Sequence, residues 1–306
     1  MKKPHEYPAK VMLVGEYAVI LGGSALTIPF TGFRALVRPV EDIPPGKEKQ
    51  AQQSFEYLEK IYEYLQDIPP GNFHASPDLE NFAAKRQKHW LDLDIPIGFG
   101  LGSSGTVSAA IYDLYFPGVN KLSLKQKKED LALIESFFHG KSSGVDALTC
   151  HTGVALRFKS SGSIETPDFN PASLPGAYRF FLLNSEERFD TGPLVKHFLS
   201  QMEDPGFKRA MEEEYLPLNQ LLLEALLRER EADPAMMLKW VSDFQLKHFR
   251  QMIPDNAVDL WIEGLVSNEY YIKLNGSGGG MMLGITHESF MESLEERWEK
   301  KLLWIA

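Results

Sequence analysis

Short segments rich in apolar and β-branched residues recur along the chain and predict β-strands. These segments lie at residues 10–20, 33–40, 89–95, 152–158, 178–183, 270–274 and 281–285, with a short last strand near the C-terminus. Between them, apolar residues repeat at the spacing of one face of an α-helix. The helical segments lie at residues 51–66, 106–115, 123–138 and 288–300, and residues 191–268 are mostly helical. Because strands and helices mix without a regular βαβ alternation, the pattern predicts an α+β fold rather than a doubly wound sheet.

Ser, Gly and Pro cluster at residues 159–175 and mark a soft boundary in the chain. A chain of 306 residues can form one large domain or two ordinary ones, each with a hydrophobic core. We therefore expect an N-terminal domain at residues 1–157 and a C-terminal domain at residues 158–306. We interpret the apolar stripes within residues 191–268 as part of the hydrophobic core rather than as a dimer interface. The sequence is compatible with either a monomer or a homodimer.

Charge and cysteine content narrow the class of protein. The chain has 32 basic and 42 acidic residues and a net charge of −10, which argues against a nucleic-acid partner. A small anionic substrate in a locally basic pocket is still compatible with this balance. The single cysteine, Cys150, excludes an internal disulfide, favours a reducing compartment and is interpreted as a small buried residue. Since Gly15-Glu16-Tyr17 interrupts the N-terminal apolar stretch, we expect no signal peptide, no membrane partner and a cytoplasmic location.

Residues 100–105, Gly-Leu-Gly-Ser-Ser-Gly, lie between an apolar segment and a helical one. Glycine lets the backbone approach a ligand closely, and Ser103 and Ser104 at a helix start can cap free N–H groups. A helix N-terminus also attracts phosphate, so the segment predicts a phosphate cradle. The same letters match the G-x-G-x-x-G dinucleotide motif, but residues 120–125 begin a helix where that motif needs an acid ending a second strand. No Walker string and no Cys/His metal spacing occurs in the sequence.

Glu135 and Asp146 are two acids that suit phosphoryl transfer. A kinase needs one carboxylate to hold Mg²⁺ against the triphosphate and another to act as a base or to orient the acceptor hydroxyl. Glu135 ends an amphipathic helix, and Asp146 follows a Ser/Gly turn. The structural alternatives are a solvated helix acid and an N-cap aspartate for a helix that starts at Ala147.

The glycine run at residues 276–280 and Lys10 can each be interpreted as functional or as structural. Residues 276–280 hold four glycines between two β segments, more than a plain hairpin needs, and so predict a close approach of the backbone to a ligand. The alternative is a wide, flexible turn. Lys10 lies near Glu16 at the first strand and can offset phosphate charge, although a lone lysine at a strand start is usually a surface residue.

Together these features resemble the GHMP small-molecule kinases, a family that includes galactokinase, homoserine kinase, mevalonate kinase and phosphomevalonate kinase. Residues 8–19 (PAKVMLVGEYAV), 100–104 (GLGSS) and 273–280 (KLNGSGGG) look like the family's motifs one, two and three, in order and with fitting spacing. Glu135, the string Ser143-Gly144-Val145-Asp146 and the following GVALRF at residues 153–158 look most like mevalonate kinase. The resemblance implies an N-terminal half like domain 2 of ribosomal protein S5 and a ferredoxin-like C-terminal half with a helical insert.

The resemblance also implies roles for individual residues. ATP and Mg²⁺ would be the cofactors, and a small-molecule alcohol would be the acceptor. Asp146 would be the catalytic carboxylate that faces the acceptor hydroxyl, and Lys10 would lie beside it and offset developing charge. Ser104 and Glu135 would ligate Mg²⁺. The residues expected to bind the nucleotide are Gly100, Leu101, Gly102, Ser103, Ser104, Gly105, Gly278, Gly279 and Gly280.

The chain departs from the family pattern at several positions. Ala9 stands before the motif-one lysine where glycine is usual, and Thr106 follows motif two where the family usually has alanine. Gly15-Glu16-Tyr17 is more like phosphomevalonate kinase than mevalonate kinase, so phosphomevalonate kinase is the second hypothesis. Another GHMP kinase is less well supported. A non-catalytic sensor with this fold is the distant alternative, against which the retained Glu135 and Asp146 argue.

Overall fold

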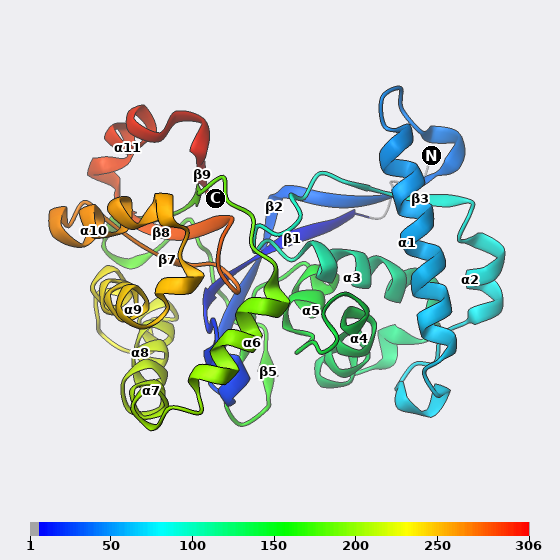
Figure 1. Ribbon diagram of the computed structural model, residues 1–306, viewed down its shortest axis with the longest axis horizontal. Helices are drawn as coiled ribbons and strands as arrows, with labels where there is room; N and C mark the ends of the chain where they lie inside the picture. Colours follow the sequence, from blue (N-terminus) through cyan, green and yellow to red (C-terminus); the bar gives the residue numbers. More distant parts are fainter. Residues whose placement is uncertain (1–5, 306) are drawn as a thin grey trace. The chain divides into compact units, whose positions relative to one another are not determined.

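Two sheets with antiparallel pairings and eleven α-helices make up this computed structural model, which describes residues 6–305 apart from the side chain of His139 (Figure 1). The strands are β1 (Glu6–Val14), β2 (Ala25–Pro39), β3 (His89–Leu93), β4 (Leu156–Phe158), β5 (Ile164–Glu165), β6 (Tyr178–Asn184), β7 (Tyr270–Leu274), β8 (Met281–His287) and β9 (Leu302–Trp304). The helices are α1 (Glu48–Gln66), α2 (Leu79–Lys85), α3 (Ser103–Tyr115), α4 (Leu124–His139), α5 (Val145–Thr152), α6 (Thr191–Gln201), α7 (Pro205–Ala210), α8 (Leu216–Leu226), α9 (Pro234–His248), α10 (Val258–Ser267) and α11 (Met291–Trp298).

The chain forms two compact units, each built from separate stretches of sequence. Unit 1 comprises Met1–Lys10, Pro29–Pro96 and Gly102–Val154, and unit 2 comprises Val11–Ile28, Ile97–Leu101 and Ala155–Ala306. One sheet has the order β1-β2-β4-β5 with β3 also paired to β2, and the other has the order β7-β8-β6-β9. The division into halves at residue 157 stays a prediction.

Unit 1 is organised around α3, α4 and α5, which pack against one another (Figure 1). The buried carboxylate of Asp130 on α4 accepts hydrogen bonds from the backbone N–H groups of His74 and Ala75 at 2.7 and 3.0 Å. It also accepts one from the hydroxyl of Tyr112 on α3 at 2.7 Å. Because a buried carboxylate is costly without such donors, Asp130 fixes α4 against α3 and the loop that precedes α2.

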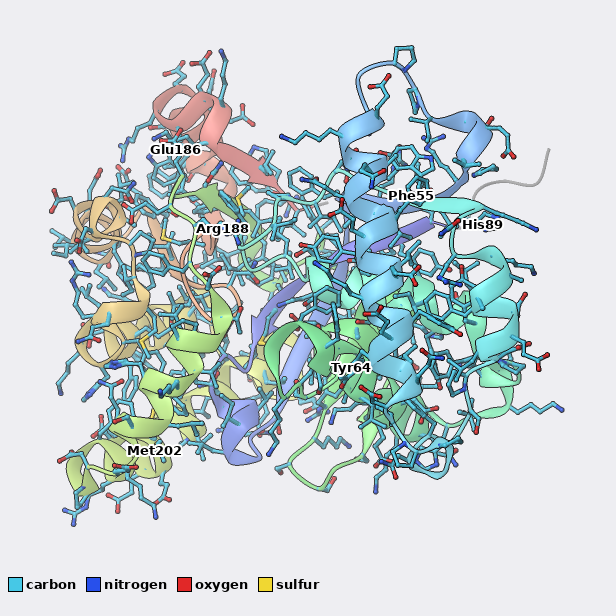
Figure 2. All side chains as sticks on the ribbon, turned by 45° about the vertical axis from the view of Figure 1, so that its right-hand side comes forward. Phe55, Tyr64, His89, Glu186, Arg188 and Met202 are labelled. Atoms are coloured by element: carbon cyan, nitrogen blue, oxygen red, sulfur yellow. The ribbon has the colours of Figure 1, made fainter. Side chains whose placement is uncertain are left out.

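Helix α1 packs on β3, α2 and α4. Its apolar stripe is buried at Leu58, Ile61 and Leu65, as the helical spacing of residues 51–66 predicts. Figure 2 marks Phe55 and Tyr64 on this helix, and the Tyr64 hydroxyl donates a hydrogen bond of 3.0 Å to the carbonyl of Leu133 on α4.

Unit 2 contains the four-stranded sheet, with α9 packed on β7 and β8 and α10 packed on β7. Phe181 of β6 pairs with Gly284 of β8. A Cβ built on Gly284 would lie 2.1 Å from the Phe181 ring, so only glycine leaves room for it. The fully buried Trp261 of α10 donates a hydrogen bond of 3.1 Å to the Ser242 carbonyl on α9. None of the helices described for the chain has the length and hydropathy needed to cross a membrane.

The structure confirms the α+β class and corrects several boundaries. The strand predicted at residues 10–20 ends at Val14, because Gly15 adopts φ +120° and Tyr17 adopts φ +60°, which turn the chain into a 3₁₀ helix at Ala18–Leu21. Strand β2 begins well before residue 33. Helix α2 was not predicted, and its N-cap residue Asp78 accepts a hydrogen bond from the Asn81 N–H at 2.9 Å.

Candidate active site

Lys10 is buried in β1, with a relative exposure of 1%, so its interpretation as a surface residue is wrong. Its Nζ lies 3.0 Å from Oδ2 of Asp146. Burial of an ammonium group requires such a partner. The Asp146 side chain is 30% exposed, so the pair is accessible from the carboxylate side.

Asp146 lies in the first turn of α5, whose N-cap is Gly144. The alternative of an N-cap aspartate is therefore wrong, since the helix begins at Val145. A carboxylate in the first turn is favoured by the positive end of the helix dipole. The helix N-terminus and the Lys10 ammonium thus both place positive charge beside the Asp146 carboxylate.

Glu135 lies on α4 and is 4% exposed, so it is not a solvated helix acid. Its Oε1 accepts a hydrogen bond of 3.0 Å from the Ser104 hydroxyl, and its Oε2 accepts one from the Ser142 hydroxyl. Burial and the nearby charge of Asp146 raise the pKa of the Glu135 carboxyl to about 7. A cation bound at Glu135 would compensate both the burial of its carboxylate and the repulsion from Asp146.

Helix α3 does not begin with the serine cap that the sequence predicted. Its N-cap residue is Gly102, and no side chain accepts a hydrogen bond there as a cap among the described residues. Ser103 and Ser104 occupy the first turn instead, and the Ser104 hydroxyl donates to Glu135. The first turn of α3 therefore has no side-chain cap at its N-cap position, which is compatible with an anion at this helix end.

Two glycines of motif two allow this helix end to lie against the ion pair. A Cβ on Gly102 would lie 2.8 Å from the Cγ of Lys10. A Cβ on Gly105 would lie 2.8 Å from the backbone nitrogen of Ala147 and 2.9 Å from the carbonyl carbon of Asp146. Glycine at these positions thus brings the first turns of α3 and α5 together, and two positive helix ends meet beside Asp146.

The other predicted nucleotide-binding residues, Gly100, Leu101 and Gly278–Gly280, belong to unit 2. A Cβ on Gly100 would lie 2.2 Å from the Asn275 carbonyl oxygen, and the Asn275 amide donates a hydrogen bond of 3.2 Å to the Gly100 carbonyl. A Cβ on Gly280 would lie 2.2 Å from Cα of Phe99. The glycines of motifs two and three therefore allow close backbone packing within unit 2, and the turn at residues 276–280 is tightly held rather than wide.

Glu16, considered with Lys10 in the sequence, forms a different ion pair. Both Glu16 and Lys273 are 0% exposed, and the Lys273 ammonium donates to Oε1 of Glu16. The same ammonium donates to the carbonyls of Leu274 at 2.8 Å and Met12 at 3.3 Å. This pair ties motif one to motif three inside unit 2.

Cys150 is buried, as predicted, and accepts a hydrogen bond from the Thr106 hydroxyl at 3.4 Å. Burial raises the pKa of its thiol to about 12, so the thiolate needed for nucleophilic chemistry is disfavoured. Cys150 therefore has a structural role beneath α3.

The donors around Glu135 fit a magnesium ion that arrives with a nucleotide. Within the described residues there is no group of three or more His, Cys, Asp and Glu side chains that could hold a metal alone. Mg²⁺ needs only one or two protein carboxylates because it keeps waters and binds substrate phosphates. Glu135, Asp146 and the Ser104 hydroxyl supply oxygen donors of this kind, and the raised pKa of Glu135 marks a position where positive charge would be favourable.

Comparison with solved structures extends over nearly the whole chain. L. major mevalonate kinase in complex with R-mevalonate is 16% identical, with a TM-score of 0.63, and the match covers 99% of this chain and 95% of that one. Lactococcus lactis galactokinase is 13% identical, with a TM-score of 0.64 and coverage of 99% and 93%. Streptococcus pneumoniae phosphomevalonate kinase in complex with phosphomevalonate and AMPPNP is 16% identical, with a TM-score of 0.61 and coverage of 98% and 99%. No protein-family model and no curated protein matches the sequence.

This chain has the GHMP kinase fold. The resemblance inferred from three motifs is thus confirmed for the fold, including its likeness to mevalonate kinases. At identities this low, the shared fold leaves the acceptor to be argued from the site itself.

Within this GHMP kinase fold, unit 1 brings together seven of the predicted site residues. They are Lys10, Gly102, Ser103, Ser104, Gly105, Glu135 and Asp146. Sequence reasoning missed Ser142, which holds Glu135, and the bonding role of Asn275. Ser142 lies in the Ser/Gly turn that was recognised, but nothing in the local sequence indicates which hydroxyl faces α4.

Proposed function

We propose that this chain is an ATP-dependent small-molecule kinase that transfers the γ-phosphoryl group of ATP to a hydroxyl of mevalonate, a step in isoprenoid precursor synthesis. The observation that carries the proposal is the accessible Lys10–Asp146 pair beside the first turns of α3 and α5. A buried cation, an accessible carboxylate and two positive helix ends favour phosphoryl transfer to an alcohol, because they orient the hydroxyl and stabilise negative charge.

In this proposal Asp146 accepts a hydrogen bond from the acceptor hydroxyl and orients it for in-line attack. Its exposed fraction of 30% allows this contact. Lys10 stays behind Asp146 and stabilises the negative charge that develops as the hydroxyl proton is lost. Positioning and charge stabilisation then supply most of the rate enhancement.

The phosphates of ATP are proposed to bind at the first turn of α3. By the motif resemblance, Gly100–Gly105 and Gly278–Gly280 are also proposed to contribute to nucleotide binding. Ser104 and Glu135 would hold Mg²⁺, which when bound offsets the charge of the phosphate oxygens. Ser142 keeps the Glu135 carboxylate oriented toward Ser104.

The choice of mevalonate rests on the string Ser143-Gly144-Val145-Asp146 and its interval from Glu135. Phosphomevalonate is the second candidate acceptor because Gly15-Glu16-Tyr17 resembles that kinase; Tyr17 is buried, and its hydroxyl donates to the Ser277 carbonyl in motif three. A cytoplasmic location and a monomeric or homodimeric state stay predictions.

The test is acceptor-dependent release of ADP from MgATP, with mevalonate, phosphomevalonate, galactose and homoserine supplied in turn. Phosphorus NMR of the product distinguishes a phosphomonoester from a diphosphate. We expect release with mevalonate and a phosphomonoester product. Release with phosphomevalonate alone would transfer the function to the second candidate, and nucleotide binding without release for any acceptor would favour a sensor.

A further inference from the structure

A short segment of unit 2 between β6 and α6, Ser185–Phe189, contacts Gly98 and the motif-three glycines Gly279 and Gly280. Figure 2 labels two of its residues, Glu186 and Arg188. It holds Gly280 from both sides of the peptide: the Ser185 N–H donates to the Gly280 carbonyl at 2.8 Å, and the Gly280 N–H donates to the Glu187 carbonyl at 2.6 Å. We call Ser185–Phe189 the brace. No predicted motif includes it.

The brace also packs its side chains against glycines. A Cβ on Gly279 would lie 2.6 Å from Cγ of Phe189, so the ring lies directly on that glycine. A Cβ on Gly98 would lie 2.5 Å from Cγ of Arg188. One segment thus touches motif three and also the stretch that leads into motif two.

Met252 holds the other side of the motif-three loop. Its carbonyl accepts a hydrogen bond of 3.2 Å from the Gly279 N–H, and a Cβ on Gly278 would lie 2.4 Å from the same oxygen. The brace itself is anchored, since the Asn256 side chain donates to the Ser185 carbonyl at 2.7 Å. The loop is therefore held between Met252 and the Phe189 ring.

We propose that Phe189 is a positioning residue that fixes the motif-three glycines and thereby sets the affinity for ATP; this inference rests on the proposed function. A run of glycines has many accessible backbone conformations, and it has no side chains of its own with which to select one. The Phe189 ring restricts Gly279 from outside. Without the ring, ordering of the loop opposes nucleotide binding, while the acceptor and the chemical step at Asp146 are unaffected.

The experiment compares Phe189→Leu with Phe290→Leu, which changes another half-buried phenylalanine of unit 2. Calorimetry gives the Kd for MgATP, and steady-state kinetics give both KM values and kcat. We expect Phe189→Leu to raise the Kd and KM for ATP about tenfold, while kcat and the KM for the acceptor stay unchanged. A tenfold change is typical of the interaction between two residues in contact. Phe290→Leu is expected to keep wild-type values, and Phe189→Tyr to restore most of the ATP affinity.

A second pair of variants tests the contact itself. A methyl group from Gly279→Ala would lie 2.6 Å from Cγ and 2.7 Å from Cβ of Phe189. Phe189→Ala removes the first contact and keeps the second, so Gly279→Ala should weaken ATP binding less in the Phe189→Ala background than in wild type. The strain of alanine at φ +67° is present in both backgrounds and cancels in the comparison. An unchanged Kd in Phe189→Leu, or additive losses in the double variant, would overturn the inference and leave the proposed function standing. A wild-type protein that binds no MgATP would overturn the proposed function and this inference with it.

Discussion

Among the residues that the structure describes, two buried lysines form ion pairs, and the two pairs differ in the exposure of the acid. Lys10 is 1% exposed and its partner Asp146 is 30% exposed, whereas Lys273 and Glu16 are both 0% exposed. The Lys273 ammonium also donates to two backbone carbonyls. Lys273 and Glu16 are thus fully enclosed, while part of the Asp146 side chain is exposed.

Under the proposed function, the two lysine–carboxylate pairs serve two purposes. An enclosed pair with added hydrogen bonds specifies how motif one joins motif three, and removing one partner leaves a buried charge. A pair that is open on the carboxylate side gives a polarised acceptor for a hydroxyl proton. Exposure of the acid, more than the presence of the lysine, separates the catalytic candidate from the structural pair.

The largest expected effect is the loss of turnover in Asp146→Asn. The amide cannot accept the hydroxyl proton, so kcat should fall by roughly 10⁴-fold, the upper end for one acid–base group. ATP binding should persist, because the first turn of α3 is unchanged. Stopped-assay ADP release and calorimetry measure the two quantities, and near-normal kcat would remove Asp146 from the mechanism.

The enclosed pair should respond through stability instead. Glu16→Gln removes the negative charge that faces the buried Lys273 ammonium, and we expect the free energy of unfolding to fall by about 3 kcal/mol. Asp146→Asn also removes a charge that faces a buried lysine, but it should cost less, since water reaches the 30% exposed side chain at position 146 and partly compensates the charge of Lys10. Urea denaturation of both variants measures the contrast, and equal losses would contradict it.

A smaller effect is expected from Glu135→Gln. The amide is a weaker ligand for Mg²⁺, so the Mg²⁺ concentration needed for half-maximal turnover should rise about tenfold. Ser142→Ala removes a hydrogen bond to Glu135 but keeps the carboxylate, so the Mg²⁺ concentration needed for half-maximal turnover should rise less than in Glu135→Gln. An unchanged Mg²⁺ dependence in Glu135→Gln would count against the ligand role.

The smallest effect is a pH dependence of stability. The Glu135 pKa is about 7 in the folded protein and 4.5 ordinarily, so the folded state binds the extra proton between these values. Stability from this group is therefore present at low pH and is lost as the pH rises through 7. We expect wild type to lose more stability than Glu135→Gln between about pH 5 and about pH 7.5, without Mg²⁺ or nucleotide. Parallel urea midpoints across that range would show that Glu135 does not titrate there.

The sequence alone could predict the longer helices and the motif residues, but not α2 or the partners of the charged side chains. Helix α1 has an apolar stripe long enough to define it, and the Ser143–Asp146 string placed Asp146 by resemblance. The partners Lys10 and Asp146, or Lys273 and Glu16, are far apart in the chain, so only the folded backbone brings each pair together.

Two errors in the predicted element boundaries have tertiary contacts as their cause. The apolar pattern of residues 10–20 continues past Val14, although the strand ends there. Gly15 packs so closely on Ala25 that a Cβ at position 15 would lie 2.5 Å from the Ala25 Cβ. The turn there depends on that tertiary contact. Ser103 and Ser104 were expected to cap α3, yet Gly102 occupies the N-cap because a side chain would collide with Lys10.

The central claim, that only the accessible pair performs chemistry, is tested most directly by comparing Lys10→Met with Lys273→Met. Acceptor-dependent ADP release and the urea midpoint are measured for both variants against wild type, at a temperature where each is folded. The account predicts that Lys10→Met loses most of its turnover even where the urea midpoint shows that it is folded. It predicts that folded Lys273→Met keeps most of its turnover and unfolds at a lower urea concentration than wild type. Equal loss of turnover in the two folded variants would contradict it.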